Sequence, residues 1–227
     1  MIEIIDCEQG SAEWFAARAG VVTASEFATV MAKGKDGGVS VTRAKYMRQL
    51  AGEILTEEPA PEGYTNGFME RGKLLEDDAR THYAFMRDAD PQRVGFIKDG
   101  RAGCSPDSLI GEDGGLEIKT AIPAVQIERL QRGGLPTEHK AQVQGCMLIT
   151  GRPWWDFMSY CPKLPPLIVR VERDAAYLAQ LASAIDVFNT ELDALVASIR
   201  TLENPRHQFD LSTLPPETAR AAALLRV

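Results

Sequence analysis

The chain has 227 residues, of which 44% are hydrophobic and 25% charged, and its formal net charge is −7. This composition is typical of a globular protein and excludes a largely disordered chain. No apolar run approaches the ~20 residues that cross a bilayer, and the acidic N-terminus is too short for a secretory signal. We therefore expect a soluble, cytoplasmic protein with no membrane partner.

The first part of the chain is predicted to be helical, because apolar residues recur three and four positions apart. Thr23 and Glu26 have the spacing of a capping box that would begin a second helix, and Thr42 would cap a third. The expected helices cover residues 12–19, the segment after Glu26, residues 42–54 and residues 68–86.

After Met86 the apolar period changes from 3.6 to 2, which indicates strands. These are expected at residues 94–98, 102–105, 108–110, 116–120, 154–160 and 167–172, with turns at Asp99-Gly100 and Glu112–Gly115. Helices are expected at residues 123–132 and 137–150, and Asp174 would cap a last long helix.

This order predicts one α/β domain over residues 1–200, with a central mixed β-sheet flanked by helices. Residues 201–227 are expected to form a tail with a short helix over 216–225, either packed on a neighbouring subunit or frayed.

Cysteine and histidine spacing limits the kinds of metal site. The chain has no Cys-x-x-Cys pair, which excludes a zinc ribbon, and its histidines are too scattered for a zinc site. The residues are Cys7, Cys104, Cys146, Cys161, His82, His139 and His207. A bound metal would have to be held by carboxylates.

Basic residues are concentrated in two segments of this acidic chain. Residues 33–48 include five basic residues and one acidic residue. Residues 119–173 include eight basic and four acidic residues. A solvated helix face explains any one such cluster. The two together leave open a basic channel for a polyanion.

The segment from Asp107 to Lys119 is the most informative for chemistry. Glu117 and Lys119 lie two positions apart on a predicted strand, so their side chains project from the same face. The hairpin would bring Asp107 beside them. The two carboxylates and the Ile118 carbonyl suit Mg²⁺, and Lys119 would orient the attacking water or lower its pKa. An ordinary surface hairpin with a Glu–Lys pair explains this motif alone equally well.

Residues on the flanking helices have two interpretations each. Glu76 would be a third carboxylate at the metal site, or it would pair with Arg80 at the i,i+4 spacing. Gln142 and Gln144 would hydrogen-bond DNA or a metal ligand, or they would lie on a solvated helix face.

A possible anion pocket lies near the N-terminus. Arg18 and Ser25 flank a predicted helix N-terminus, whose free N–H groups favour a phosphate monoester. Plain capping by Thr23 and Glu26, with Arg18 solvated, is the alternative.

Five linked segments resemble the phage lambda exonuclease and YqaJ-like viral recombinase family of the PD-(D/E)xK nuclease superfamily. The resemblance covers roughly residues 10–175, and five motifs in order are more specific than any one of them. They are Trp14…Arg18-x-Gly-Val-x-Thr23-Ala-Ser25-Glu26, Gly72-Lys-x-x-Glu76-x-Asp-Ala-Arg80, Cys104-Ser-Pro-Asp107, Gly115-Leu-Glu117-x-Lys119 and Ala141-Gln-Val-Gln144.

The resemblance implies a restriction-endonuclease-like core and a Mg²⁺-dependent enzyme, with Mn²⁺ as an expected substitute. Such enzymes degrade linear duplex DNA processively from 5′ to 3′ and leave 3′ single strands for recombination. The implied assembly is a homotrimeric ring, the implied partner is a single-strand annealing protein, and the implied setting is a bacterial host carrying a phage or prophage. Arg71, where the family has an aromatic residue, and the loop at residues 33–38 depart from the pattern.

By motif match, Asp107, Glu117 and Lys119 would form the catalytic core, with Glu76 near the metals. Arg18, Ser25 and Ser105 would grip the 5′-phosphate, and Gln142 would be the motif glutamine. Two alternatives stay open: an endonuclease of the same fold, and a catalytically silent DNA-end-binding module.

Overall fold

The computed structural model describes residues 1–35, 37–38, 40–60 and 67–202, without the side chains of residues 67–73. The tail helix expected at residues 216–225 and the side chain of Arg71 lie outside this description. No helix in the described ranges is long and apolar enough to cross a membrane.

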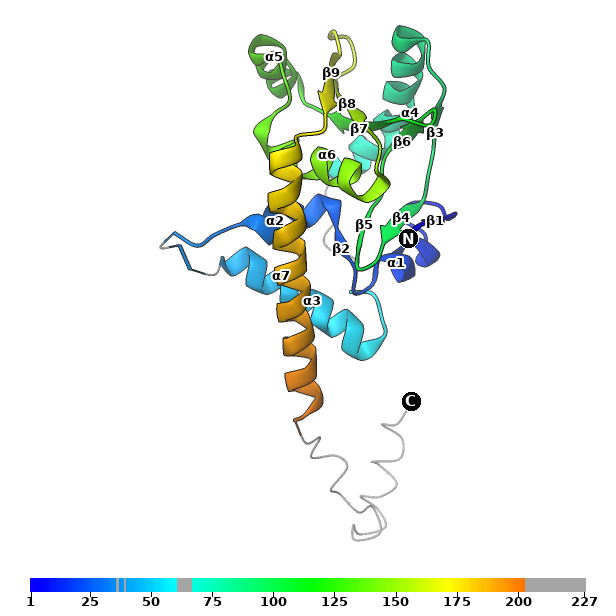
Figure 1. Cartoon of the computed structure of the whole chain (residues 1–227). Helices are drawn as coiled ribbons and strands as arrows, with labels where there is room; N and C mark the ends of the chain where they lie inside the picture. Colours follow the sequence, from blue (N-terminus) through cyan, green and yellow to red (C-terminus); the bar gives the residue numbers. More distant parts are fainter. Residues whose placement is uncertain (36, 39, 61–66, 203–227) are drawn as a thin grey trace.

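The helices lie close to their predicted positions (Figure 1). Asp174 caps the last helix as predicted, since its side chain accepts a hydrogen bond from the Tyr177 N–H at 3.0 Å. The helices are α1 (Ala12–Arg18), α2 (Phe27–Met31), α3 (Val41–Thr56), α4 (Gly67–Arg87), α5 (Pro123–Arg132), α6 (Thr137–Thr150) and α7 (Ala175–Arg200).

Two predicted caps are wrong. Residues after Thr23 form a 3₁₀ turn, η1 (Ala24–Glu26), and the Thr23 hydroxyl lies 3.2 Å from Ser25 Oγ instead of capping a backbone N–H. The third helix begins after Ser40, whose hydroxyl lies 2.8 Å from that of Thr42. Both hydroxyls have a neighbouring hydroxyl within reach, and this competes with capping.

The strands form two sheets, where the sequence predicted one. The first has the order β1-β4-β5-β2, and the second has the order β3-β6-β7-β8-β9. The strands of the first sheet are β1 (Ile2–Ile5), β4 (Phe96–Asp99), β5 (Ala102–Cys104) and β2 (Val22–Thr23). Those of the second are β3 (Pro91–Gln92), β6 (Ser108–Ile110), β7 (Gly114–Thr120), β8 (Trp154–Tyr160) and β9 (Leu167–Glu172).

The break between the sheets falls at Ser105-Pro106-Asp107, between β5 and β6. Proline has no N–H to give to a ladder, so Pro106 favours a break at this point. The sequence missed β1, β2 and β3, and both β2 and β3 are only two residues long. Both sheets are mixed: β2 pairs with β5 and β7 pairs with β8 in parallel, while the other pairs are antiparallel.

Strand β7 begins earlier than predicted, because Gly114 and Gly115 belong to the strand and not to the turn. A Cβ at these positions would lie 2.0 Å from the Trp154 ring and 2.3 Å from the Trp155 ring, respectively. Only glycine permits so close an approach of the two indoles. The turn is therefore formed by residues 111–113.

Helices cover both faces of the second sheet. Leu116 and Ile118 of β7 pack with Ala79 and Tyr83 of α4 on one face. The opposite face belongs to the larger core, where α6 packs against β8 and α7 packs against α6. The pleat of β7 therefore turns Glu117 and Lys119 toward α6.

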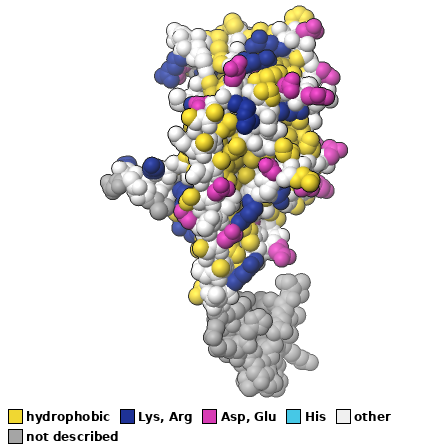
Figure 2. All heavy atoms as spheres, viewed as in Figure 1, with side chains coloured by type: hydrophobic (Ala, Val, Ile, Leu, Met, Phe, Trp, Pro, Cys, Tyr) yellow, Lys and Arg dark blue, Asp and Glu magenta, His cyan; other side chains and the backbone are white. Residues whose placement is uncertain are grey.

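The basic segment at residues 119–173 is largely bonded within the fold, and its role as a channel lining stays a prediction. Arg152 donates to the carbonyls of Ile110, Gly111 and Gly114, and Arg170 pairs with Asp156 at 2.9 Å. On the face shown in Figure 2, basic and acidic side chains are interspersed.

Candidate active site

Glu117 is the centre of the candidate site. Its side chain is buried, and the residue is 1% exposed. Lys119 Nζ lies 2.5 Å from Glu117 Oε1, and Gln142 Nε2 of α6 donates to the same oxygen at 2.5 Å. The structure thus brings together the predicted strand pair and the predicted glutamine.

Asp107 joins this group from the connection between the two sheets. Its Oδ2 accepts a hydrogen bond from the Ile118 N–H at 2.5 Å, which ties the connection to β7. Burial raises the pKa of Asp107 well above its usual value, and the nearby Glu117 charge raises it further; Lys119 opposes both effects.

Lys119 keeps its proton at this site. Burial alone would lower its pKa, but the charges of Glu117 and Asp107 outweigh burial and raise the pKa above its usual value. An ammonium group has only donors. An ammonium at this position is suited to hold a water or a phosphate oxygen.

The donor set at Asp107 and Glu117 fits a hard divalent cation. Glu117 Oε2 is buried, and no hydrogen-bond donor in the described part of the chain reaches it. A buried carboxylate oxygen without a partner is costly unless a cation or water satisfies it. Within the described residues, no group of three or more His, Cys, Asp and Glu side chains is arranged to hold a metal. Mg²⁺, however, is usually held by one or two carboxylates and several waters.

Glu76 forms one of the two contacts predicted for it. It accepts from Arg80 Nη2 at 2.5 Å, so the i,i+4 pair is formed. Its carboxylate lies near enough to Asp107 to raise the pKa of that side chain. The structure therefore places Glu76 beside the site, but a metal role for it remains a prediction.

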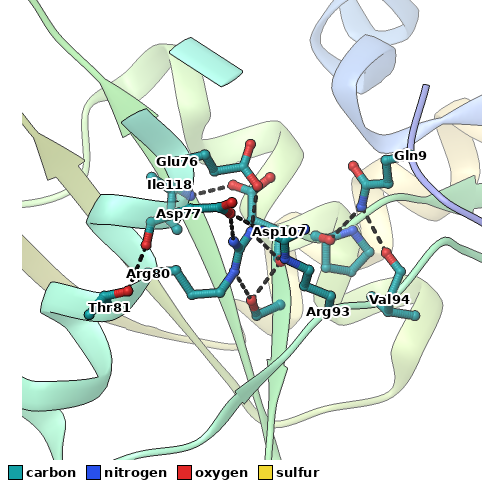
Figure 3. A network of polar contacts seen from close by, with 11 residues as sticks. Gln9, Glu76, Asp77, Arg80, Thr81, Arg93, Val94, Asp107 and Ile118 are labelled. Carbon is teal, nitrogen blue, oxygen red and sulfur yellow. Dashed lines mark hydrogen bonds and ion pairs between the residues drawn. The ribbon is translucent and has the colours of Figure 1, made fainter. Parts of the chain in front are cut away.

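Arg80 links helix α4 to the connection between the two sheets (Figure 3). Besides Glu76 it bonds Asp77 at 2.6 Å and Ser108 Oγ at 2.9 Å, and its Nη2 donates to the Asp107 carbonyl at 3.2 Å. The sequence interpretation recognised only the i,i+4 pair. The position of Arg80 at the end of the Gly72–Arg80 motif was the one sequence signal for its bonds to Ser108 and Asp107.

Gln9 bonds the connection between the two sheets from its other side. Its amide donates to the carbonyls of Val94 and Pro106, both at 2.8 Å. The sequence analysis did not single out Gln9, because nothing local marks its partner 97 residues away. Gln144, in contrast, is buried and bonds the backbone of Glu172 and Asp174. The predicted DNA contact by Gln144 is therefore wrong.

A second group of polar side chains surrounds Ser105. Its Oγ accepts from Trp14 Nε1 at 2.9 Å and from Arg18 Nη1 at 3.1 Å. The Arg18 guanidinium stacks on the Trp14 ring at 4.0 Å. Arg18 and Ser25 line one pocket of about 220 Å³. Arg18 and Ser25 thus share one pocket, and Ser105 contacts Arg18 without lining that pocket.

The same pocket holds a buried acid that the sequence interpretation missed. Glu53 accepts from the Gly20 N–H at 2.7 Å and from Gln49 at 3.1 Å. It shares the buried face of α3 with Tyr46 and Leu50. Its i+7 and i+3 spacing from those residues was the signal that could have found it.

The chain is similar to known nucleases. The YqaJ-like viral recombinase domain matches residues 13–153. An alkaline exonuclease from Laribacter hongkongensis is 36% identical, and the match covers 84% of this chain and 96% of that one with a TM-score of 0.76. Its complex with dAMP gives the same values.

A phage-related exonuclease from Haemophilus somnus is 14% identical, with 79% and 96% of the chains covered and a TM-score of 0.60. At this identity the likeness concerns the fold alone. These structures confirm the predicted fold class, a PD-(D/E)xK core of mixed strands flanked by helices. Among proteins with curated descriptions, none matches the chain.

Proposed function

Because the chain belongs to the YqaJ-like viral recombinase family, we propose that it is a Mg²⁺-dependent exonuclease acting on linear double-stranded DNA. It would degrade one strand processively from 5′ to 3′ and leave 3′ single strands for recombination by annealing. The observation that carries this proposal is the buried Glu117 carboxylate, bonded by Lys119 and Gln142 beside Asp107. The similar Laribacter hongkongensis enzyme, an alkaline exonuclease studied with dAMP, supports DNA as the substrate class.

The residues that would hold Mg²⁺, or Mn²⁺ in its place, are Asp107, Glu117 and the Ile118 carbonyl. When bound, the ion would lower the pKa of a water and offset charge on the scissile phosphate. The Lys119 ammonium would orient that water or a phosphate oxygen through its N–H donors. Gln142 would hold the Glu117 carboxylate in one orientation by its amide bond.

The pocket around Arg18 would set the 5′-to-3′ direction of digestion. Arg18, Ser25 and Ser105 offer a cation and hydroxyls to a terminal 5′-phosphate. Ser105 lies two residues before Asp107, so at most ~7 Å of extended chain separates their Cα atoms. One strand end could therefore reach both the pocket and the carboxylates.

The expected setting follows the family. We propose a homotrimeric ring around the duplex, action in the cytoplasm of a bacterial host, and cooperation with a single-strand annealing protein. A ring would reconcile the net charge of −7 with a polyanionic substrate, because only its inner surface needs to be basic.

Substitution of a single buried carboxylate tests the proposal. Glu117→Gln keeps the size of the side chain but removes its charge, so digestion of linear duplex DNA should fall by more than ~100-fold. Glu112→Gln is the matched control, because it removes an exposed charge from the turn of the same hairpin. The assay follows separate 5′ and 3′ end labels with Mg²⁺ and with EDTA.

Three outcomes would contradict the proposal. Cutting of closed circular duplex would favour the endonuclease, and release from 3′ ends would reverse the polarity. DNA-end binding without digestion in the wild-type protein would favour the silent module.

A further inference from the structure

A second polar cluster lies beside the candidate active site and has no role in the proposal above. Arg129 of α5 donates from Nη1 to Ser159 Oγ at 3.0 Å, and its Nη2 lies 3.1 Å from His139 Nε2. Ser159 is the register partner of Lys119 in the parallel β7–β8 ladder. Side chains of paired residues project to the same face, so Arg129 lies beside Lys119.

Ser159 and His139 hold the Arg129 guanidinium in one orientation. The Ser159 hydroxyl donates its proton to Gln126 Oε1 at 2.6 Å, which leaves its oxygen free to accept from Arg129. Burial lowers the pKa of His139 to about 4, helped by the charges of Lys119 and Arg129. The imidazole is therefore neutral near pH 7, and Nε2 accepts a bond from a group that can only donate.

The charge of Arg129 is poorly compensated. Its side chain is only 14% exposed, and the one carboxylate paired with it in the described residues is that of Glu138, 3.9 Å away and 62% exposed. The buried Arg80, in contrast, bonds the Glu76 carboxylate directly. A cation held in a partly dry site without a bonded anion favours an anionic ligand.

We propose that Arg129 binds a phosphate of the DNA strand lying on the Glu117–Lys119 face, as a backbone contact separate from the Arg18 pocket. Two of its five N–H donors are used by Ser159 and His139, and three remain for phosphate oxygens. This inference rests on the proposed function, because it requires DNA at this face.

The salt dependence of DNA binding tests the contact. The full chain would be titrated onto a 5′-phosphorylated linear duplex with EDTA present, and fluorescence anisotropy would be followed at several NaCl concentrations. Loss of one phosphate contact in Arg129→Gln should reduce the slope of log K against log[salt] by about 0.7–0.9. If Arg129 only stabilised the fold, Arg129→Gln would lower the melting temperature without changing this slope.

Two further variants make the test specific. Arg129→Lys keeps the charge but loses the planar fork, so it should keep the slope and bind roughly 5-fold more weakly. Arg87→Gln is the control, because Arg87 lies on α4 at the opposite face of the same sheet, near Asp156. Its slope should equal that of the wild-type protein.

The inference is overturned by an unchanged slope in Arg129→Gln, or by an equal fall in Arg87→Gln. If Arg129→Gln does not fold, wild-type affinity in Arg129→Lys overturns it. The proposed function fails in a different way, namely if the wild-type protein neither binds nor digests linear DNA.

Discussion

Individual side chains at this site depend on partners that hold them in place before any substrate arrives. Arg18 is an example, because it bonds Ser105 and stacks on Trp14. Burial lowers the pKa of its guanidinium, although nearby acids such as Glu53 oppose this effect. A pre-positioned cation loses little further conformational entropy when it binds a phosphate.

Arg18→Ala should therefore reduce discrimination between DNA ends. Wild-type protein should digest 5′-phosphorylated duplex faster than 5′-hydroxyl duplex, and the variant should narrow that ratio by about 10-fold, in line with one charge-assisted contact. Initial rates on the two substrates measure the ratio.

Arg101→Ala is the control for that experiment, because Arg101 lies in the β4–β5 turn and pairs with Asp193 of α7 at 2.5 Å. It should keep the wild-type ratio. A ratio near one in the wild-type protein would argue against a 5′-phosphate pocket around Arg18.

At the level of elements, helix α6 brings Gln142 to Glu117 because this helix packs closely against η1 and α2. Gly145 lies at this contact, where a Cβ would be 2.3 Å from the Phe27 ring. Phe27 is completely buried, so its ring has little room to move.

Gly145→Ala should destabilise the protein by about 1–3 kcal/mol through overpacking. Gly52→Ala is the matched control in helix α3, since no atom lies within 4 Å of its Cβ position. It should be neutral or stabilising by up to about 1 kcal/mol, because alanine is the better helix former. Urea unfolding followed by circular dichroism measures both, and equal stability of the two variants would contradict the packing argument.

For the whole molecule, the proposed ring is the feature that reconciles charge with substrate. Many basic residues of segment 119–173 are bonded within the chain, as Arg152 and Arg170 are. Because its net charge is −7, one subunit by itself offers little long-range attraction to DNA, and a ring would place the basic surfaces of several subunits around the duplex.

Light scattering coupled to gel filtration should accordingly report about three chains per particle across a range of concentrations. A monomer at every concentration would remove the ring and leave the nuclease site of each subunit unaffected. The measurement thus separates the assembly from the chemistry.

The sequence by itself determined the order of the α-helices and of strands β4 to β9, and the shared face of Glu117 and Lys119. Both follow from local periods of 3.6 and 2, which need only neighbouring residues. The tertiary structure decided the division into two sheets at Ser105–Asp107. It also decided the bond from Arg80 to the Asp107 carbonyl, and the choice of Gln142 over Gln144 as the partner of Glu117. Such pairings join residues far apart in the chain, 25 positions for Gln142 and Glu117, and only the packing of elements sets their distances.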